Sequence, residues 1–340
     1  MVQIVPYDPA RKSEISQLME RTLGLRAGRP RDEAYWTWKH ELNPFGPSLV
    51  LLAEEHGRLV GMRAFMRWEL ETGTTRLAAG KPVDSVTDPQ FQRRGIFSQL
   101  TQAACEQARA EGIRLLFNTP NRNSLPGYLK LGWQQVGRLR VRLDLLRPLS
   151  MAWRVVSRRA VFDDNWPASC FTSAPQRAAD VLDDAEEINA LINAATRPAR
   201  ALATRRDQAF LKWRYSLHPH EQYYAETVRT GDRLQGILLF RLGRRRGFTE
   251  VMIDDAIVRR DSQGCLASLL ESLKARTRAD YFASHAPGTA DWRAARRSSG
   301  LTWQWTKAVD FVARSLDDID DLNPARLDSW RLCLGDLEGL

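Results

Sequence analysis

The sequence predicts an α/β protein with mixed sheets, built from two similar halves. Its 340 residues exceed the roughly 250–300 residues at which a single hydrophobic core stops growing. Residues 83–118 change from a strand pattern to a helical period and back to a short apolar run, which indicates a β-α-β unit. The order of patterns in the first 145 residues also recurs later in the chain.

Composition limits the class of protein. Apolar residues make up 43% of the chain and charged residues 27%, the balance of a globular protein. No run of about 18 apolar residues occurs, so we expect a cytoplasmic protein with no membrane partner. The net charge of +9 favours an anionic partner: nucleic acid, an acidic surface or a phosphate-bearing cofactor. Four isolated cysteines without metal-ligand spacing predict reduced packing residues and no metal site; they are Cys105, Cys170, Cys265 and Cys333.

Hydrophobic period and turn signals predict the elements of the first half. In order, we expect a strand at 3–7, helices at 11–23 and 32–41, a hairpin at 48–72, a third strand ending near 88, a helix at 95–112, a buried strand at 114–118, a short helix within 123–133 and a closing strand at 134–146. The buried strand should pair in parallel with the third strand, because a helix connects them.

An internal repeat predicts a tandem architecture. "YWTWKHELNP" at 35–44 resembles "FLKWRYSLHP" at 210–219, with Trp38 matching Trp213 and Lys39 matching Arg214. After each segment come a hairpin, a third strand containing Asp, a helix, a short strand and a closing strand. We therefore predict an N-terminal domain at 1–146, a linker at 147–177, a diverged C-terminal domain at 178–315 and a tail at 316–340.

The turn "QFQRRGIF" at 90–97 has the properties of an anion site. A helix N-terminus leaves amide N–H groups unpaired and carries partial positive charge, so it attracts phosphate. Arg93 and Arg94 add two charges, and Gly95 lets the backbone approach a ligand. The turn is therefore a candidate for binding a diphosphate, and a solvated helix start is the alternative. The chain has neither a P-loop nor the three glycines of a dinucleotide fingerprint.

Residues 83–133 resemble the core of the GNAT acetyltransferase superfamily. Pro89, Phe91, Gln92 and Gly95 match its signature, and "NTPN" at 118–121 and "YLKLGW" at 128–133 extend the match. Phe97 departs from it, because the family usually has Gly or Ala there. A side chain at this position leaves less room beside the cofactor, which keeps the identity of the acyl donor open.

The resemblance implies a mostly antiparallel sheet flanked by helices, with acetyl-coenzyme A as co-substrate between two splayed parallel strands and no metal. The pyrophosphate would lie on the amides of residues 93–97, and pantetheine would pair with the strand at 83–86. The cofactor-binding residues that it implies are Val83, Ser85, Val86, Gln92, Arg93, Arg94, Gly95, Ile96, Phe97, Asn118, Asn121 and Asn123.

Candidate catalytic residues follow from the same match. Tyr128 corresponds to the family's tyrosine that donates a proton to the coenzyme A sulfur; packing against the strand is its alternative role. Asp84 is a candidate base because it lies on the strand that should line the cleft, although strand carboxylates are often ion-paired. Trp36 and Trp38 are candidates for stacking on the acceptor, and a core position is the other interpretation.

The second half lacks the same phosphate chemistry. Its turn "RRDSQGCLAS" at 259–268 includes Asp261, which brings negative charge to a helix start. We expect this half to support the first and to wall off the acceptor cleft rather than to bind a second coenzyme. The arginines at 244–246 are interpreted as a solvated turn. The tail residues Asp336 and Glu338 could reach an active site or cap the surface, and we expect them at the surface.

The predicted function is transfer of an acetyl group from acetyl-coenzyme A to a primary amine of a small molecule, an amino sugar or amino acid derivative. Direct attack is expected, because no Cys or Ser is placed with a His as an activated nucleophile. A non-catalytic acyl-coenzyme A sensor or scaffold, and a nucleic-acid-binding module, are the alternatives. O-acetylation and longer acyl donors stay open, and the sequence specifies neither the acceptor nor the oligomeric state.

Overall fold

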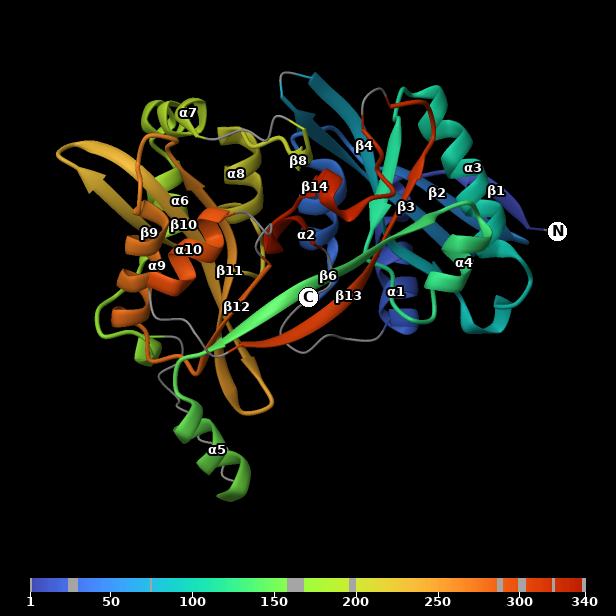
Figure 1. The fold of residues 1–340 in the computed structure, drawn as a ribbon. Coiled ribbons are helices and arrows are strands. Elements are labelled where there is room, and N and C mark those ends of the chain that lie inside the picture. Colours follow the sequence, from blue (N-terminus) through green and yellow to red (C-terminus); the bar gives the residue numbers. More distant parts are fainter. Residues whose placement is uncertain are drawn as a thin grey trace.

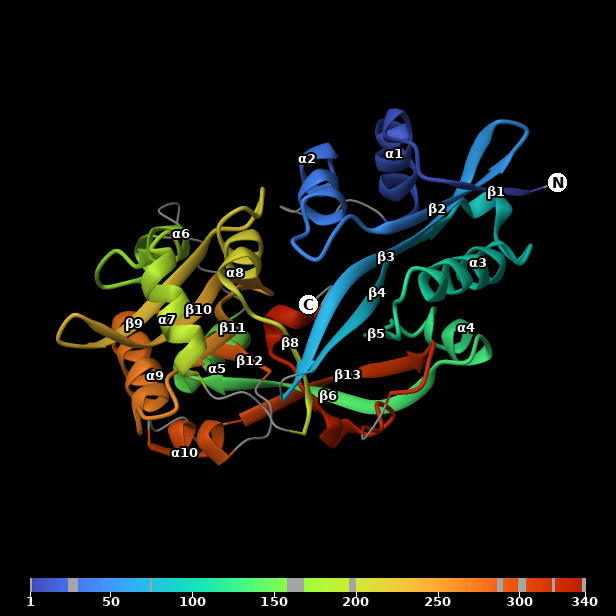
Figure 2. The ribbon, with the colours of Figure 1, turned by 90° about the horizontal axis from the view of Figure 1, so that it is seen from above.

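One mixed sheet runs through the protein. The computed structural model describes residues 2–23, 30–73, 75–157, 168–195, 200–285, 290–298, 304–319 and 322–337. Within these ranges, fourteen strands form a single connected sheet with helices on both faces (Figures 1 and 2). The predicted α/β class with a mixed sheet is confirmed.

The first half follows the predicted order of elements. They are β1 (Gln3–Pro6), α1 (Lys12–Leu23), α2 (Glu33–Trp36) with a π-helical turn (Thr37–Glu41), β2 (Leu49–Glu55), β3 (Arg58–Thr72), β4 (Thr75–Thr87), α3 (Ile96–Ala110), β5 (Leu115–Asn118), α4 (Leu125–Lys130) and β6 (Gln134–Leu145). His56 and Gly57 both have positive φ, as a tight two-residue hairpin requires. Because β4 and β5 pair in parallel across α3, the predicted β-α-β unit is confirmed.

The second half repeats this order from β9 to β13. After α5 (Pro148–Ser157), its elements are β7 (Gln176–Arg177), α6 (Ala178–Leu182), α7 (Ala185–Ala194), β8 (Leu202–Thr204), α8 (Gln208–Tyr215), β9 (Tyr223–Thr230), β10 (Arg233–Arg245), β11 (Phe248–Val258), α9 (Cys265–Arg276), β12 (Tyr281–Ser284), α10 (Ala290–Ser298), β13 (Gln304–Ser315) and β14 (Trp330–Arg331). Three antiparallel strands, a helix, a short parallel strand and a long closing strand thus occur twice. The proposed domain limits stay a prediction.

The closing strands of the two halves are exchanged. β13, from the second half, pairs with β5 of the first, placing Val312 opposite Asn118. β6, from the first half, pairs with β12 of the second, placing Leu145 opposite Tyr281. β6 and β13 also pair with each other and form the long diagonal that joins the two halves in Figure 1. Neither half therefore has a complete sheet of its own.

Helices cover both faces of the first half's strands. α1 and α2 lie on one face and α3 on the other (Figure 2). Ile15 and Leu18 of α1 are fully buried in the central core, and Leu100 and Ala104 of α3 are buried in a separate core on the opposite face. In each pair the spacing is three or four residues, which places both side chains on one stripe of their helix.

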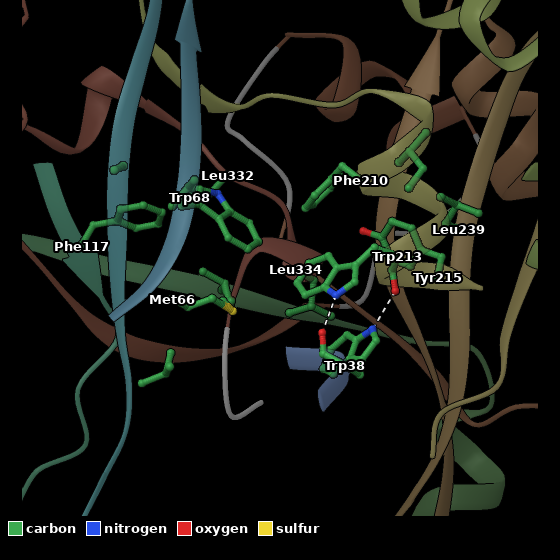
Figure 3. Packing of buried hydrophobic residues seen from close by; sticks show 14 of the residues in the cluster. Trp38, Met66, Trp68, Phe117, Phe210, Trp213, Tyr215, Leu239, Leu332 and Leu334 are labelled. Carbon is green, nitrogen blue, oxygen red and sulfur yellow. Dashed lines mark hydrogen bonds between the residues drawn. The ribbon is translucent and has the colours of Figure 1, made fainter. Parts of the chain in front are cut away.

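A pair of tryptophans joins the halves at the centre of the core (Figure 3). The rings of Trp38 and Trp213 are stacked, with centroids 4.9 Å apart and planes inclined by 12°. Each indole N–H donates to the other residue's backbone carbonyl, at 2.8 Å from Trp38 and 2.7 Å from Trp213. Residues that correspond in the sequence repeat thus bind each other reciprocally.

We expect Trp213→Ala to lower the free energy of unfolding by about 3–5 kcal/mol, because it leaves a large cavity in this core. Trp213→Phe keeps most of the ring and loses the hydrogen bond to Trp38, so its cost should be closer to about 1–2 kcal/mol. Denaturant titrations of both variants measure the difference. Wild-type stability for Trp213→Ala would show that the stacked pair does not hold the halves together.

α5 is a helix that the sequence analysis missed, since it lies in the predicted linker. Its apolar side chains face solvent, with Leu149 86% and Trp153 70% exposed. The helix extends away from the body of the protein (Figure 1). Met151 is partly buried and packs against the central core. Of the rest of the predicted linker, residues 158–167 lie outside the described residues, and residues 168–177 include β7.

Candidate active site

The two parallel strands of the first half diverge and open a pocket. β4 pairs with β5 at only two positions, Ala79 with Leu115 and Gly80 with Leu116. Beyond Gly80, residues 81–85 of β4 and residues 117–121 at the end of β5 line opposite sides of a pocket of about 230 Å³. α4 contributes Tyr128 to its lining. The predicted splayed strands are therefore present, and one edge of β4 has no strand partner here.

Asp84 lies at a bulge in β4. The register between β3 and β4 shifts between Met62 and Ala64, opposite this residue. Its φ of 45° is in the left-handed region, which aspartate adopts more readily than most side chains. Strained backbone of this kind is concentrated at functional sites. The bulge places Val83, Asp84 and Ser85 along the pocket.

Two residues of the π-helical turn Thr37–Glu41 hold Asp84 as a carboxylate. Its Oδ2 lies 2.7 Å from Lys39 Nζ and 3.2 Å from His40 Nε2. Burial alone would raise the pKa of Asp84, but the charge of Lys39 and the hydrogen bond with His40 outweigh it and hold this pKa well below its ordinary value. So weak a proton acceptor does not suit the predicted role of general base.

Two further carboxylates, at the end of the neighbouring strand β2, are also paired and do not suit the role of base. Glu54 forms an ion pair with Arg11, and Glu55 forms one with Arg94. His40 is 2% exposed and also contacts Ser48 Oγ at 3.0 Å, so it packs as expected and does not line the pocket.

Tyr128 has the placement that a proton donor needs. Its side chain is 4% exposed and lines the pocket, and within the described part of the chain its hydroxyl makes no hydrogen bond. The ring packs edge-on against Phe97 and Trp133, at centroid distances of 5.8 and 5.1 Å. The ring is thus fixed by packing, while the phenol is available to a ligand.

Phe97 supports Tyr128 and does not line the pocket. A Cβ on Gly127 would lie 3.0 Å from the Phe97 ring, so the large residue fits because position 127 has no side chain. The expectation that Phe97 leaves less room beside the cofactor at the turn stays a prediction. Beneath both rings lies Arg63, fully buried, whose guanidinium is 5.1 Å from the Phe97 centroid and 5.0 Å from that of Tyr128. No nitrogen of this guanidinium has a hydrogen-bond partner among the described residues.

The basic turn before α3 has the backbone of an anion site. Arg93 and Gly95 have left-handed φ values of 65° and 79°, with Gly95 as the N-cap of the helix. Left-handed residues alternating with right-handed ones turn successive N–H groups toward one side. The first N–H groups of α3 also have no acceptor within the helix. Arg94 is directed to Glu55, with Nη1 3.0 Å from Oε2, so it contributes less charge to the turn than predicted.

Only some of the predicted cofactor-binding residues line the pocket beside Tyr128. Val83, Ser85, Asn118 and Asn121 line the pocket, whereas Val86 and Ile96 are buried, 3% and 2% exposed. Gln92 donates to Thr87 O, and Asn123 does not line the pocket. Asn118 is the most informative, because its buried Oδ1 has no hydrogen-bond partner in the described structure. An unpaired buried acceptor is costly unless a ligand donates to it.

Trp36 and Trp38 are core residues rather than acceptor-binding residues. They are 1% and 4% exposed, and neither lines the pocket. The same helix instead presents Tyr35 and Lys39 to the pocket, which the sequence analysis missed. The wide apolar face of this helix concealed them, since aromatic and long basic side chains on a buried helix resemble core packing.

The C-terminal tail forms another wall of the pocket. Asp336 is 1% exposed, so the expectation that it lies at the surface is wrong. Lys81 Nζ donates to the Asp336 carbonyl at 2.6 Å, and the Asp336 carboxylate pairs with Arg206 at 3.0 Å. Asp336 and Leu337 both line the pocket. Glu338 lies outside the described residues.

Comparison with known proteins identifies the fold of this site. Residues 7–136 match the family model of the acetyltransferase (GNAT) domain. No curated protein matches the chain. Solved structures of GCN5-related N-acetyltransferases from Anabaena variabilis and Kribbella flavida align with TM-scores of 0.63 at 14% identity, covering 93% of this chain and 73% and 71% of theirs. Eis1 from Mycobacterium abscessus aligns at 0.57 and 14% identity, covering 93% of this chain and 74% of its own.

The matched segment contains the diverging strands, the glycine turn and α4, which together define an acyltransferase fold. Residues 7–136 thus match a GNAT acetyltransferase domain, as the motif predicted. Enzymes of this family transfer acyl groups. Within the described residues, no helix is long and apolar enough to cross a membrane.

Proposed function

We propose that the protein transfers an acetyl group from acetyl-coenzyme A to a primary amine of a small molecule. The pyrophosphate would lie on the amides of residues 93–97, and the pantetheine arm would pair with the free edge of β4. Tyr128 would donate the proton that the departing thiolate needs, after direct attack by the amine. The observation that carries this proposal is the phenol of Tyr128, held in the pocket with no partner among the described residues.

The charges of the pocket favour one of the two predicted acceptor classes. Arg31, Lys39 and Lys81 line it, and the acidic residues Asp84 and Asp336 already have ion-pair partners. Arg31 Nη1 is buried and has no hydrogen-bond partner among the described residues. An acceptor carboxylate would satisfy this group, since arginine binds carboxylates by charge-assisted hydrogen bonds. We therefore propose an amino acid derivative rather than an amino sugar as the acceptor.

The test follows thiol release from acetyl-coenzyme A with amino acids, their amides and amino sugars. We expect turnover with the free carboxylates and at least a tenfold lower kcat/KM with the matching amides. Turnover with amino sugars alone would contradict the acceptor class. Binding of coenzyme A without turnover on any amine would refute the enzyme and favour the sensor.

Gly95 offers a matched pair of variants for the cofactor site. Both Asn and Asp tolerate left-handed φ, and a Cβ here would meet only Gln99 Nε2, at 3.7 Å. Gly95→Asp places a negative charge against the pyrophosphate and should weaken coenzyme A binding by about tenfold or more, since nearby like charges repel by several kcal/mol. Gly95→Asn adds the same volume without charge and serves as the control. Equal affinities of the two variants, measured by calorimetry, would exclude an anion at this turn.

A further inference from the structure

The second half contains a larger pocket than the first. Its volume is about 850 Å³, compared with about 230 Å³ for the pocket beside Tyr128. Residues 255–258 of β11, the start of α9 and one side of α10 line it. By the repeated order of elements, β11 and α9 correspond to β4 and α3. The pocket thus occupies the place in the second half that the cofactor would occupy in the first.

The strands beside this pocket diverge as they do in the first half. β11 pairs in parallel with β12 from Glu250 to Ile253, and this pairing then ends while β11 continues to Val258. In the first half, pairing between β4 and β5 likewise ends at Gly80. The second half has therefore kept the opening between strands that a ligand needs.

The start of α9 repeats the geometry of the start of α3. Gly264 is the N-cap of this twelve-residue helix and has a φ of 75°, compared with 79° for Gly95. A Cβ added to Gly264 would meet no atom within 4 Å, so the space in front of the helix is open. The unpaired N–H groups of a helix start attract phosphate.

The charge around the pocket is basic, contrary to what Asp261 suggested in the sequence. Five arginines line it (Arg200, Arg206, Arg259, Arg260 and Arg331), with three acidic residues. Asp261 does not line the pocket and lies 3.8 Å from Arg233 Nη2 and 3.7 Å from Arg259 Nε. The acidic residue of this turn is therefore ion-paired with two arginines, one of which, Arg259, lines the pocket.

Arg259 lies beside the pocket, and its Nε forms a long ion pair with Asp261, at 3.7 Å. Its side chain is only 10% exposed, and its Nη1 donates to Ala190 O at 3.4 Å. Its buried Nε has no hydrogen-bond partner among the described residues. A buried donor of this kind is costly unless a ligand accepts from it. Apolar side chains, including Ile257, Leu266 and Trp292, form the remainder of the lining, which suits an anion attached to an organic body.

The C-terminal tail occupies the space beside the bulge in β11, which corresponds to the place of the proposed transfer reaction in the first half. β10 and β11 have a bulge at Asp254, as β3 and β4 have at Asp84. A Cβ on Gly335 of the tail would lie 3.0 Å from Asp254 O and 2.2 Å from Tyr215 Oη. The tail therefore fills the space beside the second bulge, whereas the space beside the first bulge is an open pocket.

We propose that this pocket binds a second organic pyrophosphate, of the coenzyme A or nucleoside diphosphate type, without transferring a group from it. The pyrophosphate lies on the N–H groups at the start of α9 between Arg259 and Arg260, and the organic body lies along β11 and α10. The proposal does not depend on the transfer reaction at Tyr128. It changes the expected role of the second half from a supporting wall to a binding site.

Calorimetric titration of the full chain with coenzyme A tests the proposal. We expect the wild type to bind two molecules, Gly95→Asp and Gly264→Asp one each, and the double variant none. Gly264→Asn, which adds the same volume without charge, should keep the second molecule. Gly231→Asp is the surface control, because Gly231 has φ of 59°, an open surrounding and no place in the pocket lining; it should bind as the wild type does.

A second titration, with ADP, is carried out on Gly95→Asp. If Gly95→Asp binds ADP and the added substitution Gly264→Asp removes this binding, the site recognises a nucleoside diphosphate. If Gly95→Asp binds coenzyme A but not ADP, the site recognises the coenzyme. The proposal is overturned if Gly95→Asp binds neither probe, or if Gly264→Asp and Gly264→Asn bind equally. A chain without transferase activity on any amine must still give the Gly264-dependent result, so failure of the proposed function is seen separately.

Discussion

Tyr128→Phe should lower kcat by about 10²–10⁴, the range that a positioned proton donor contributes, while coenzyme A binds with unchanged affinity. The phenylalanine keeps the packing against Phe97 and Trp133 and removes only the hydroxyl. No hydrogen bond to a described residue is lost, so the thermal stability should stay at the wild-type level. Steady-state thiol release, calorimetry and thermal unfolding on the same preparations separate the three quantities.

Tyr223→Phe is the matched control. Tyr223 is a buried tyrosine in the second half, 2% exposed, that does not line the pocket beside Tyr128. Its loss of a hydroxyl should leave kcat unchanged. If Tyr128→Phe retains wild-type kcat, or if both variants lower kcat equally, Tyr128 is a packing residue and not the acid.

Asp84→Asn should lower the free energy of unfolding at pH 7 by about 3–5 kcal/mol, because it removes the carboxylate that forms an ion pair with the buried Lys39. Lys39 is 2% exposed and lies 2.7 Å from Asp84. The pKa of Asp84 is lowered in the folded state, so its contribution to stability is present above its unfolded pKa of about 3.9 and is lost as the pH falls below that value. The difference between wild type and variant should therefore shrink below about pH 4.

The double variant Asp84→Asn/Lys39→Met provides the control for this pair. Replacing both charges by neutral side chains of similar volume is often close to neutral for a buried pair, so it should recover much of the loss. Urea titrations at pH 7 and pH 3.5 measure all three proteins. A single-variant loss that stays constant between these pH values would show that Asp84 does not titrate as an ion-paired carboxylate.

The parts of the site that sequence predicts are those encoded by neighbouring residues. The turn at 92–97, the helix after it and Tyr128 lie within one short segment, so their spacing alone defines the motif. The equivalence of Trp38 and Trp213 was also visible, because a repeat preserves residue order. Their contact was not, since stacking across the two halves depends on how distant segments pack.

The parts that sequence did not predict come from long-range contacts. Asp336 becomes a wall of the pocket because Lys81 binds its carbonyl, and nothing near either residue in the chain encodes that hydrogen bond. Asp84 looked like a base because its partners Lys39 and His40 lie on a different element. Trp36 and Trp38 stayed candidates for stacking on the acceptor for the same reason, because their packing partners Tyr7 and Trp213 come from other parts of the chain.

The exchange of β6 and β13 makes the pocket beside Tyr128 depend on the second half of the chain. β5 carries Asn118 at the edge of the pocket, and the strand that holds its other side comes from the C-terminal part of the chain. A mutation that unfolds the second half would remove that strand and disturb the pocket directly.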